Sequence, residues 1–277
     1  MANAQKIREL EARAKEVRKN IITMIYQAQS GHPGGSLSAA DIMTALYFSE
    51  LRLDPKNPKD PNRDRFVLSK GHVCPVLYTC LALRGYYDLS VLSTLRKEGS
   101  ILQGHPDMKR CPGVDISTGS LGQGLSVAAG MAIAGKRDHK DYRVFCLLGD
   151  GESDEGQIWE AAETASKYQL NNLIVFLDRN RLQNDGVCAE IMPNLDLEKK
   201  FEAFGFESYT INGHDMKEIL NVLDKVRDSE NSAPKCIVAE TVKGKGVSYM
   251  ENVVMWHGMA PNEEQYLRAM QDLEGGF

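Results

Sequence analysis

Five short runs of apolar and β-branched residues, alternating with stretches of helical periodicity, constrain most strongly what this chain can fold into. We expect strands at residues 65–69, 143–148, 173–177, 207–211 and 235–239, with helices at 156–168 and 215–227. This alternation is typical of a parallel sheet covered by helices on both faces. No internal repeat or flexible linker divides the sequence. We therefore expect residues 1–277 to form a single α/β domain.

The charge balance argues against nucleic acid as a partner. The 277 residues carry 33 Lys and Arg against 38 Asp and Glu, a formal net charge of −5, and the basic residues are scattered among the acids. Nucleic-acid binding needs a concentrated basic surface. The sequence also lacks the ~18 consecutive apolar residues of a membrane helix, and its N-terminal segment lacks the apolar core of a signal peptide. We expect a cytoplasmic protein that contacts no membrane.

Oxygen-bearing side chains follow the second and third expected strands. Asp150 lies between Gly149 and Gly151, and Asn180 comes about thirty residues later. Neighbouring parallel strands end about 5 Å apart at one edge of a sheet, so these side chains would converge there. A carboxylate and an amide oxygen suit Mg²⁺, which usually takes further ligands from a phosphate, and Gly151 would let the backbone approach that phosphate. A Gly-Asp-Gly sequence also occurs in plain turns, and that alternative stays open.

Four of the six histidines lie in loops that contain Gly or Pro: His32, His72, His105 and His257. Imidazoles donate, accept or shuttle protons near neutral pH, which suits a polar substrate beside a phosphate site. Any one of these histidines is equally well interpreted as a solvent-facing loop residue. Four such loops in one chain favour a functional interpretation.

Taken in order, the motifs resemble a known family. The segments SGHPGG, SKGHVCPVLY, QGHPD, GVDISTGSLGQGLSVAAGMA, GDG, DRN and WHG are similar to the N-terminal, diphosphate-binding domain of transketolase, along nearly the whole chain. The resemblance implies a thiamin diphosphate-binding α/β fold with a parallel sheet. It also implies transfer of a two-carbon ketol unit from a ketose phosphate to an aldose acceptor.

The resemblance implies roles for individual residues. Mg²⁺, with Ca²⁺ or Mn²⁺ as substitutes, would be bound by the side chains of Asp150 and Asn180 and by the backbone carbonyl of Leu182. The cofactor would contact His72, Gly119, Ser120, Leu121, Gly151, Asn180 and His257. The catalytic residues facing the sugar would be His32, His105 and His257.

The resemblance also implies a partner. In the family, a second domain supplies a glutamate and a stacking aromatic residue to the cofactor pyrimidine, and this sequence matches the diphosphate side alone. We expect a separate C-terminal, pyrimidine-binding subunit in an α2β2 assembly. The helix opened by Gly119–Leu121 would bury Ala128, Ala129 and Ala132 against a neighbour, and its surroundings would face the partner. Glu155 would lie at that interface or would be an exposed acid at a helix start.

Two other functions stay open. The α-type subunit of a 2-oxo acid dehydrogenase, or a 1-deoxyxylulose-phosphate-synthase-like enzyme, would share the metal signature, although the dehydrogenases lack the GHPG and GHPD pair. The second alternative is a non-catalytic cofactor-binding module, which would not need the four loop histidines. Gly35-Ser36-Leu37 and Arg179 depart from the usual transketolase pattern, which leaves the sugar substrate open.

Other segments have plainer interpretations. We interpret His214 as a turn residue before a capped helix and His139 as a surface residue. Residues 243–246, Lys-Gly-Lys-Gly, follow a strand but lack the spacing of a phosphate loop, and we expect them near cofactor or substrate. The weakly periodic residues after about Gly246 are interpreted as a mobile lid.

Overall fold

The computed structural model describes residues 3–194 and 196–275, and within these ranges the strands form one five-stranded sheet. The strands are β1 (Arg65–Leu68), β2 (Val144–Gly149), β3 (Leu173–Arg179), β4 (Glu207–Asn212) and β5 (Lys235–Glu240). The order across the sheet is β1-β2-β3-β5-β4, and every neighbouring pair is parallel. The predicted α/β fold with a parallel sheet is confirmed.

The interior strand β2 shows why the sheet takes helices on both faces. Phe145 and Leu147 pack into one hydrophobic cluster, whereas Val144, Cys146 and Leu148 pack into a second cluster on the opposite face. Both sets are buried, as expected for a parallel strand covered on both sides. This is why the strand is continuously apolar in the sequence.

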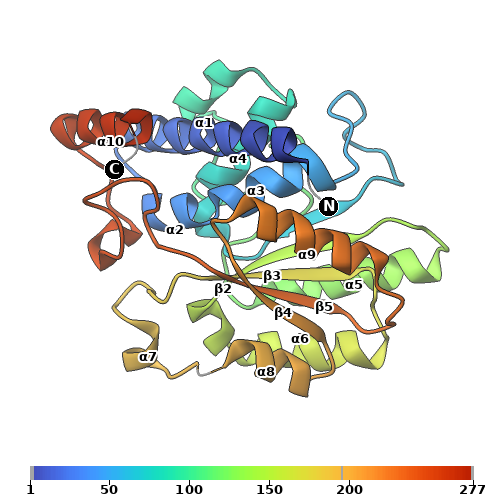
Figure 1. Ribbon diagram of the computed structural model, residues 1–277. Helices are drawn as coiled ribbons and strands as arrows, with labels where there is room; N and C mark the ends of the chain where they lie inside the picture. The colour runs from blue at the N-terminus through green and yellow to red at the C-terminus, as the bar shows by residue number, and fades with distance from the viewer. Residues whose placement is uncertain (1–2, 195, 276–277) are drawn as a thin grey trace.

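Helices form a layer on each face of the sheet (Figure 1). One face is covered by α5 (Gln123–Arg137), α6 (Gly156–Lys167) and α8 (Leu197–Ala203). The other is covered by α1 (Ala4–Ala28), α2 (Pro33–Ser38), α3 (Ala40–Ala45), α4 (Cys74–Arg84) and α9 (Met216–Asp228). The described residues also form the short helix α7 (Cys188–Ile191), a π-helical turn at Leu46–Glu50 and 3-10 turns at Gly71–Val73, Leu89–Thr94, Gly151–Asp154 and Val254–His257.

The segment after Gly246 contains a helix that we did not predict from the sequence. Helix α10 (Glu263–Gly275) runs along α1 in Figure 1 and buries Ala269 and Leu273 in the same cluster as that helix. Tyr266 and Met270 also pack against this cluster, so the apolar residues follow the i, i+3, i+4, i+7 spacing of one helix face. The interpretation of weak periodicity was therefore wrong for this part of the segment. Within the described ranges, no helix has the length and apolar character needed to cross a membrane.

The carboxyl ends of β2, β3 and β5 bring three segments together at one edge of the sheet. In register, Gly149 of β2 pairs with Asp178 of β3, and Asp178 pairs with Ala239 of β5. The residues that follow each strand therefore emerge side by side, in the position where parallel α/β sheets bind their ligands.

Candidate active site

The three predicted metal ligands lie together beyond β2 and β3. Asp150 and Asn180 are buried, with 4% and 5% of their surface exposed. Asp150 Oδ1 accepts a hydrogen bond from the Gly151 N–H at 2.8 Å, and Asn180 Oδ1 accepts one from the Leu182 N–H at 3.2 Å. These residues line one cavity of about 240 Å³. The structure thus brings the predicted metal residues to one place.

The donor set fits a hard divalent cation. Burial, with Asp178 nearby, raises the pKa of Asp150 to about 6, so a bound cation would stabilise its charged form. Among the described residues, no cluster of three or more His, Cys, Asp or Glu side chains is arranged to hold a metal alone. A carboxylate, an amide and a backbone carbonyl leave ligand positions for phosphate oxygens, which is the usual arrangement for Mg²⁺.

Three predicted histidines form a compact group. The ring centroids lie 5.1 Å apart for His32 and His72, 5.4 Å for His32 and His257, and 5.2 Å for His72 and His257. His105 is exposed, and its ring lies so close to Gly119 that a Cβ added there would come within 2.8 Å of it. Only a residue without a side chain fits at Gly119, which has φ of 152°.

These imidazoles are held in the neutral form. Burial, then the charge of Arg96, lowers the pKa of His32 to about 4. Burial, then Lys243, lowers the pKa of His257 to about 3, and burial with Lys70 holds the pKa of His72 well below its usual value. A neutral imidazole has one donor and one acceptor nitrogen. Within the described residues, His32 Nδ1 is buried and has no hydrogen-bond partner.

Not all predicted site residues line this cavity. Its walls include His72, Leu121, Asp150, Gly151, Asn180, Leu182 and His257. Gly119, Ser120, His32 and His105 are outside the lining that the described residues form. Glu155, which was expected either at an interface or at a helix start, is exposed at the cavity rim immediately before α6.

Helix α5 buries its small face within this chain. Ala128, Ala129 and Ala132 pack in the cluster beneath the sheet, together with Val144 of β2 and Ala162 of α6. The neighbour expected for these alanines is therefore the chain's own sheet and helix. The expected burial of these alanines is confirmed, so the interface predicted around this helix would use its other side chains.

Buried charged residues that were not predicted from the sequence support the site. Asp178 is fully buried and accepts hydrogen bonds from Lys70 Nζ at 2.5 Å and from Ser38 Oγ at 2.6 Å, with a further bond from Thr241 Oγ1. The Lys70 charge and these bonds outweigh burial and hold the pKa of Asp178 below its usual value. The sequence did contain a clue to these two residues, because each lies close to a predicted site residue: Asp178 precedes Asn180 by two positions, and Lys70 precedes His72 by two.

Lys243 is a second buried cation in the cavity wall. It is the first residue of the Lys-Gly-Lys-Gly segment at 243–246, and 1% of its surface is exposed. Its Nζ donates to the Leu182 carbonyl at 2.9 Å and lies 2.8 Å from His257 Nδ1. Burial, together with Lys70, lowers the pKa of Lys243 to about 8. Because the ammonium donates to Nδ1, the His257 proton is on Nε2.

Glu152 connects the three segments that shape the cavity. Its Oε1 accepts from Ser69 Oγ at 2.5 Å and from the Gly122 N–H at 3.0 Å, and its Oε2 accepts from the Gly149 N–H at 3.1 Å. One buried carboxylate thus joins the end of β1, the loop before α5 and the end of β2. Burial nevertheless raises the pKa of this carboxyl.

We expect Glu152→Gln to lower the free energy of unfolding by about 1–3 kcal/mol. A glutamine offers one acceptor oxygen and an NH₂ group, so at least one of the three donors faces another donor; removing the buried charge offsets only part of this loss. Urea unfolding at neutral pH measures the change. Glu160→Gln, an exposed position on α6, is the control, and equal unfolding free energies in the two variants would contradict the prediction.

Comparisons with known proteins agree with this geometry. A family model described as "Transketolase, thiamine diphosphate binding domain" matches residues 10–275. The chain is 42% identical over 267 residues to one of the subunits of apulose-4-phosphate transketolase from Phocaeicola vulgatus, covering 96% of this chain and 94% of that protein. It is 44% identical over 266 residues to a 6-deoxy-6-sulfo-D-fructose transketolase subunit of Clostridium sp., covering 96% of each.

Longer transketolases match over part of their length. Human transketolase is 43% identical over 257 residues, which cover 92% of this chain and 40% of that protein. The crystal structure of transketolase from Campylobacter jejuni superposes with a TM-score of 0.91 at 36% identity, covering 99% of this chain and 43% of that one. The matched region therefore carries the same fold in proteins of different total length.

Proposed function

Because this chain belongs to the transketolase family, as its thiamine diphosphate binding domain, we propose that it is the diphosphate-binding subunit of a two-chain transketolase. The observation that carries the proposal is the similarity to two relatives named as transketolase subunits, at 42% and 44% identity over 94% and 96% of their length. The partner would be a C-terminal, pyrimidine-binding subunit, in an assembly with two copies of each chain. A cytoplasmic location, expected from the sequence, is part of this proposal.

Asp150, Asn180 and the Leu182 carbonyl would hold Mg²⁺, with Ca²⁺ or Mn²⁺ as substitutes. The burial of both side chains and the raised pKa of Asp150 support this assignment. The metal would neutralise charge on the cofactor diphosphate, which Gly151 would help to hold. When bound, thiamin diphosphate supplies the carbanion chemistry that cleaves a ketose.

The histidines would bind and orient the ligands. His72 and His257 line the cavity beside the metal residues, which suits contact with the diphosphate. His32, His105 and His257 would face the sugar, and the unpartnered Nδ1 of His32 supports this role. Their lowered pKa values keep the imidazoles neutral at pH 7, so His32 and His105 can each donate one hydrogen bond to a sugar hydroxyl and accept another. His257 can only donate, from Nε2, because its Nδ1 already accepts from Lys243.

The experiment that tests this function is co-expression with the candidate partner, followed by incubation with a panel of ketoses and aldose acceptors. Relatives are named for apulose 4-phosphate and for 6-deoxy-6-sulfo-D-fructose, so the panel includes both besides common ketose phosphates. Mass spectrometry should show transfer of a two-carbon unit. Decarboxylation of a 2-oxo acid without ketose turnover would favour the dehydrogenase-type alternative, and binding without any turnover would favour the non-catalytic module.

We expect His32→Ala and His105→Ala to lower kcat in the assembled enzyme about 10- to 100-fold, with a smaller effect on thiamin diphosphate affinity. Both side chains would act on the sugar, where lost hydrogen bonds matter most in the transition state. Steady-state kinetics and calorimetry measure the two quantities. His139→Asn is the control, because His139 is exposed and its φ of 52° suits asparagine. A loss of cofactor affinity as large as the loss of kcat would contradict the assignment.

A further inference from the structure

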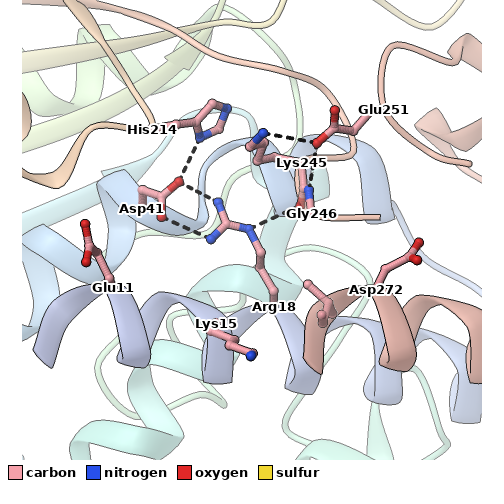
Figure 2. Close-up of a pocket in the computed structure, with 10 residues that line it drawn as sticks. Glu11, Lys15, Arg18, Asp41, His214, Lys245, Gly246, Glu251 and Asp272 are labelled. Carbon is pink, nitrogen blue, oxygen red and sulfur yellow. Dashed lines mark hydrogen bonds and ion pairs between the residues drawn. The ribbon is translucent and has the colours of Figure 1, made fainter. Parts of the chain in front are cut away.

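A buried hydrogen-bonded network of Arg18, Asp41 and His214 lies outside the cofactor cavity (Figure 2). It contacts the backbone on both sides of Lys243. The Val242 N–H donates to His214 Nε2 at 2.8 Å. On the other side, Arg18 Nε donates to the Lys245 carbonyl at 3.2 Å. The two residues that hold this segment come from α1 and from the turn before α9, far apart in the sequence.

Asp41 joins the two contacts into one unit. Its Oδ2 lies 2.7 Å from His214 Nδ1, and its Oδ1 accepts from Arg18 Nη1 at 3.0 Å. Figure 2 shows the three side chains converging at the carboxylate. Asp41 is 7% exposed and Arg18 is 8% exposed, so these bonds are shielded from water. Such shielding makes the arrangement costly to break.

The bonds also fix the tautomer of His214. Because a backbone N–H donates to Nε2, that nitrogen carries the lone pair, and the proton is on Nδ1, where the Asp41 carboxylate accepts it. His214 is in the turn that the sequence predicted, but its side chain is not a free surface group.

The segment held by this network contains two glycines with left-handed backbone. Gly244 has φ of 82°, and a Cβ there would lie 2.4 Å from the Met250 carbonyl oxygen. Gly246 has φ of 93°, and a Cβ there would lie 3.2 Å from Arg18 Cδ. Glycine allows these conformations but adds freedom in the backbone. The Asn252 N–H donates to the Lys243 carbonyl at 2.9 Å, and the side-chain contacts from Arg18 and His214 add to this backbone support.

We propose that His214, coupled to Arg18 through Asp41, is a positioning residue that fixes the Lys243 backbone, and through the Lys243 ammonium orients the His257 imidazole. The chain of contacts is continuous from His214 Nε2 to Val242 N–H, and from Lys243 Nζ to the Leu182 carbonyl and His257 Nδ1. The link to catalysis rests on the proposed function of the cavity, whereas the positioning of Lys243 and His257 is independent of that function.

Two substitutions separate the bonds that His214 makes. In His214→Gln, the amide oxygen reaches the place of Nε2 and accepts from Val242, but the bond to Asp41 is lost. In His214→Asn, the amide NH₂ takes the place of Nδ1 and donates to Asp41, but the Val242 N–H is left without an acceptor. The proposal expects the asparagine variant to disturb Lys243 and the glutamine variant to preserve its position.

Nitrogen NMR of the histidine side chains tests this on the full chain, without cofactor or partner. In the wild type, His257 should show a protonated Nε2 and an unprotonated Nδ1. His214→Asn and Lys243→Met should each abolish this fixed tautomer, and adding His214→Asn to Lys243→Met should change the His257 signal no further. An unchanged His257 signal in folded His214→Asn, or a changed one in folded His214→Gln, would overturn the proposal; the glutamine variant suffices if the asparagine variant fails to fold.

Activity of the assembled enzyme adds a second readout. We expect His214→Asn to lower kcat about 3- to 10-fold, His214→Gln to lower it less, and Lys243→Met to abolish the difference between them. If His214 only stabilised the fold, both variants would be less stable, and the difference in their kcat would not depend on Lys243. If ketol transfer itself is not found, the NMR result still stands, so failure of the proposed function and failure of this inference are distinguishable.

Discussion

The purified chain, supplied with thiamin diphosphate and Mg²⁺, is expected to turn over ketose phosphates far more slowly than about 1 per second, the low end of ordinary enzyme rates. Activating the cofactor requires a carboxyl group within about 3 Å of its pyrimidine. Asp150 and Glu152 in the cavity wall, and Asp178 buried behind it, already accept hydrogen bonds from this chain. They also lie among the residues proposed to hold Mg²⁺ and the diphosphate.

Co-expression with a candidate pyrimidine-binding subunit should restore ketose cleavage and tighten cofactor binding. The neighbouring open reading frame is the first candidate. Turnover is measured for each chain alone and for the pair, and the Asp150→Ala pair serves as the inactive control. If this chain alone reaches about 1 per second or faster, the two-chain proposal is wrong, and the exposed Glu155 at the cavity rim becomes the first carboxylate to examine.

The sheet could be predicted because its strands are buried on both faces. Strand β2 was expected at residues 143–148 and is found at Val144–Gly149, and the other strands agree to within about two residues at each end. Strand β3 extends past the apolar run, because Asp178 and Arg179 are still paired in the sheet. These polar ends serve the site, so a pattern of apolar residues cannot show them.

The buried charges could not be predicted because their partners are distant in sequence. Lys70 and Asp178 are 108 residues apart, and His214 and Asp41 are 173 residues apart. In a single sequence, each of these residues has the local features of an exposed polar residue. Only the fold shows that the side chains are buried against one another and can therefore support the predicted metal and histidine residues.

Asp150→Ala is expected to weaken Mg²⁺-dependent binding of thiamin diphosphate to the assembled protein by more than about 100-fold, since even an outer partner of a metal ligand is worth about 10- to 100-fold. Asp150 would supply the only negative charge among the three protein ligands. Asn180→Ala should weaken binding less, because it removes a neutral oxygen. Calorimetry at fixed Mg²⁺ concentration measures both affinities.

One further variant separates the charge of Asp150 from the hydrogen bonds that its side chain makes, and a second variant serves as a control. The Asp150 carboxylate also accepts from the Gly151 and Arg181 N–H groups, so alanine removes local support as well as a metal ligand. Asp150→Asn keeps an acceptor oxygen of the same shape without the charge, and should weaken binding nearly as much as alanine if the metal is what Asp150 holds.

Asp185→Ala, which removes an exposed acid on a nearby turn, is the control and should leave binding unchanged. Wild-type affinity in Asp150→Ala, with the fold intact by circular dichroism, would remove Asp150 from the metal site, because a buried carboxylate that contributes its charge to a cation cannot be deleted without weakening that bond.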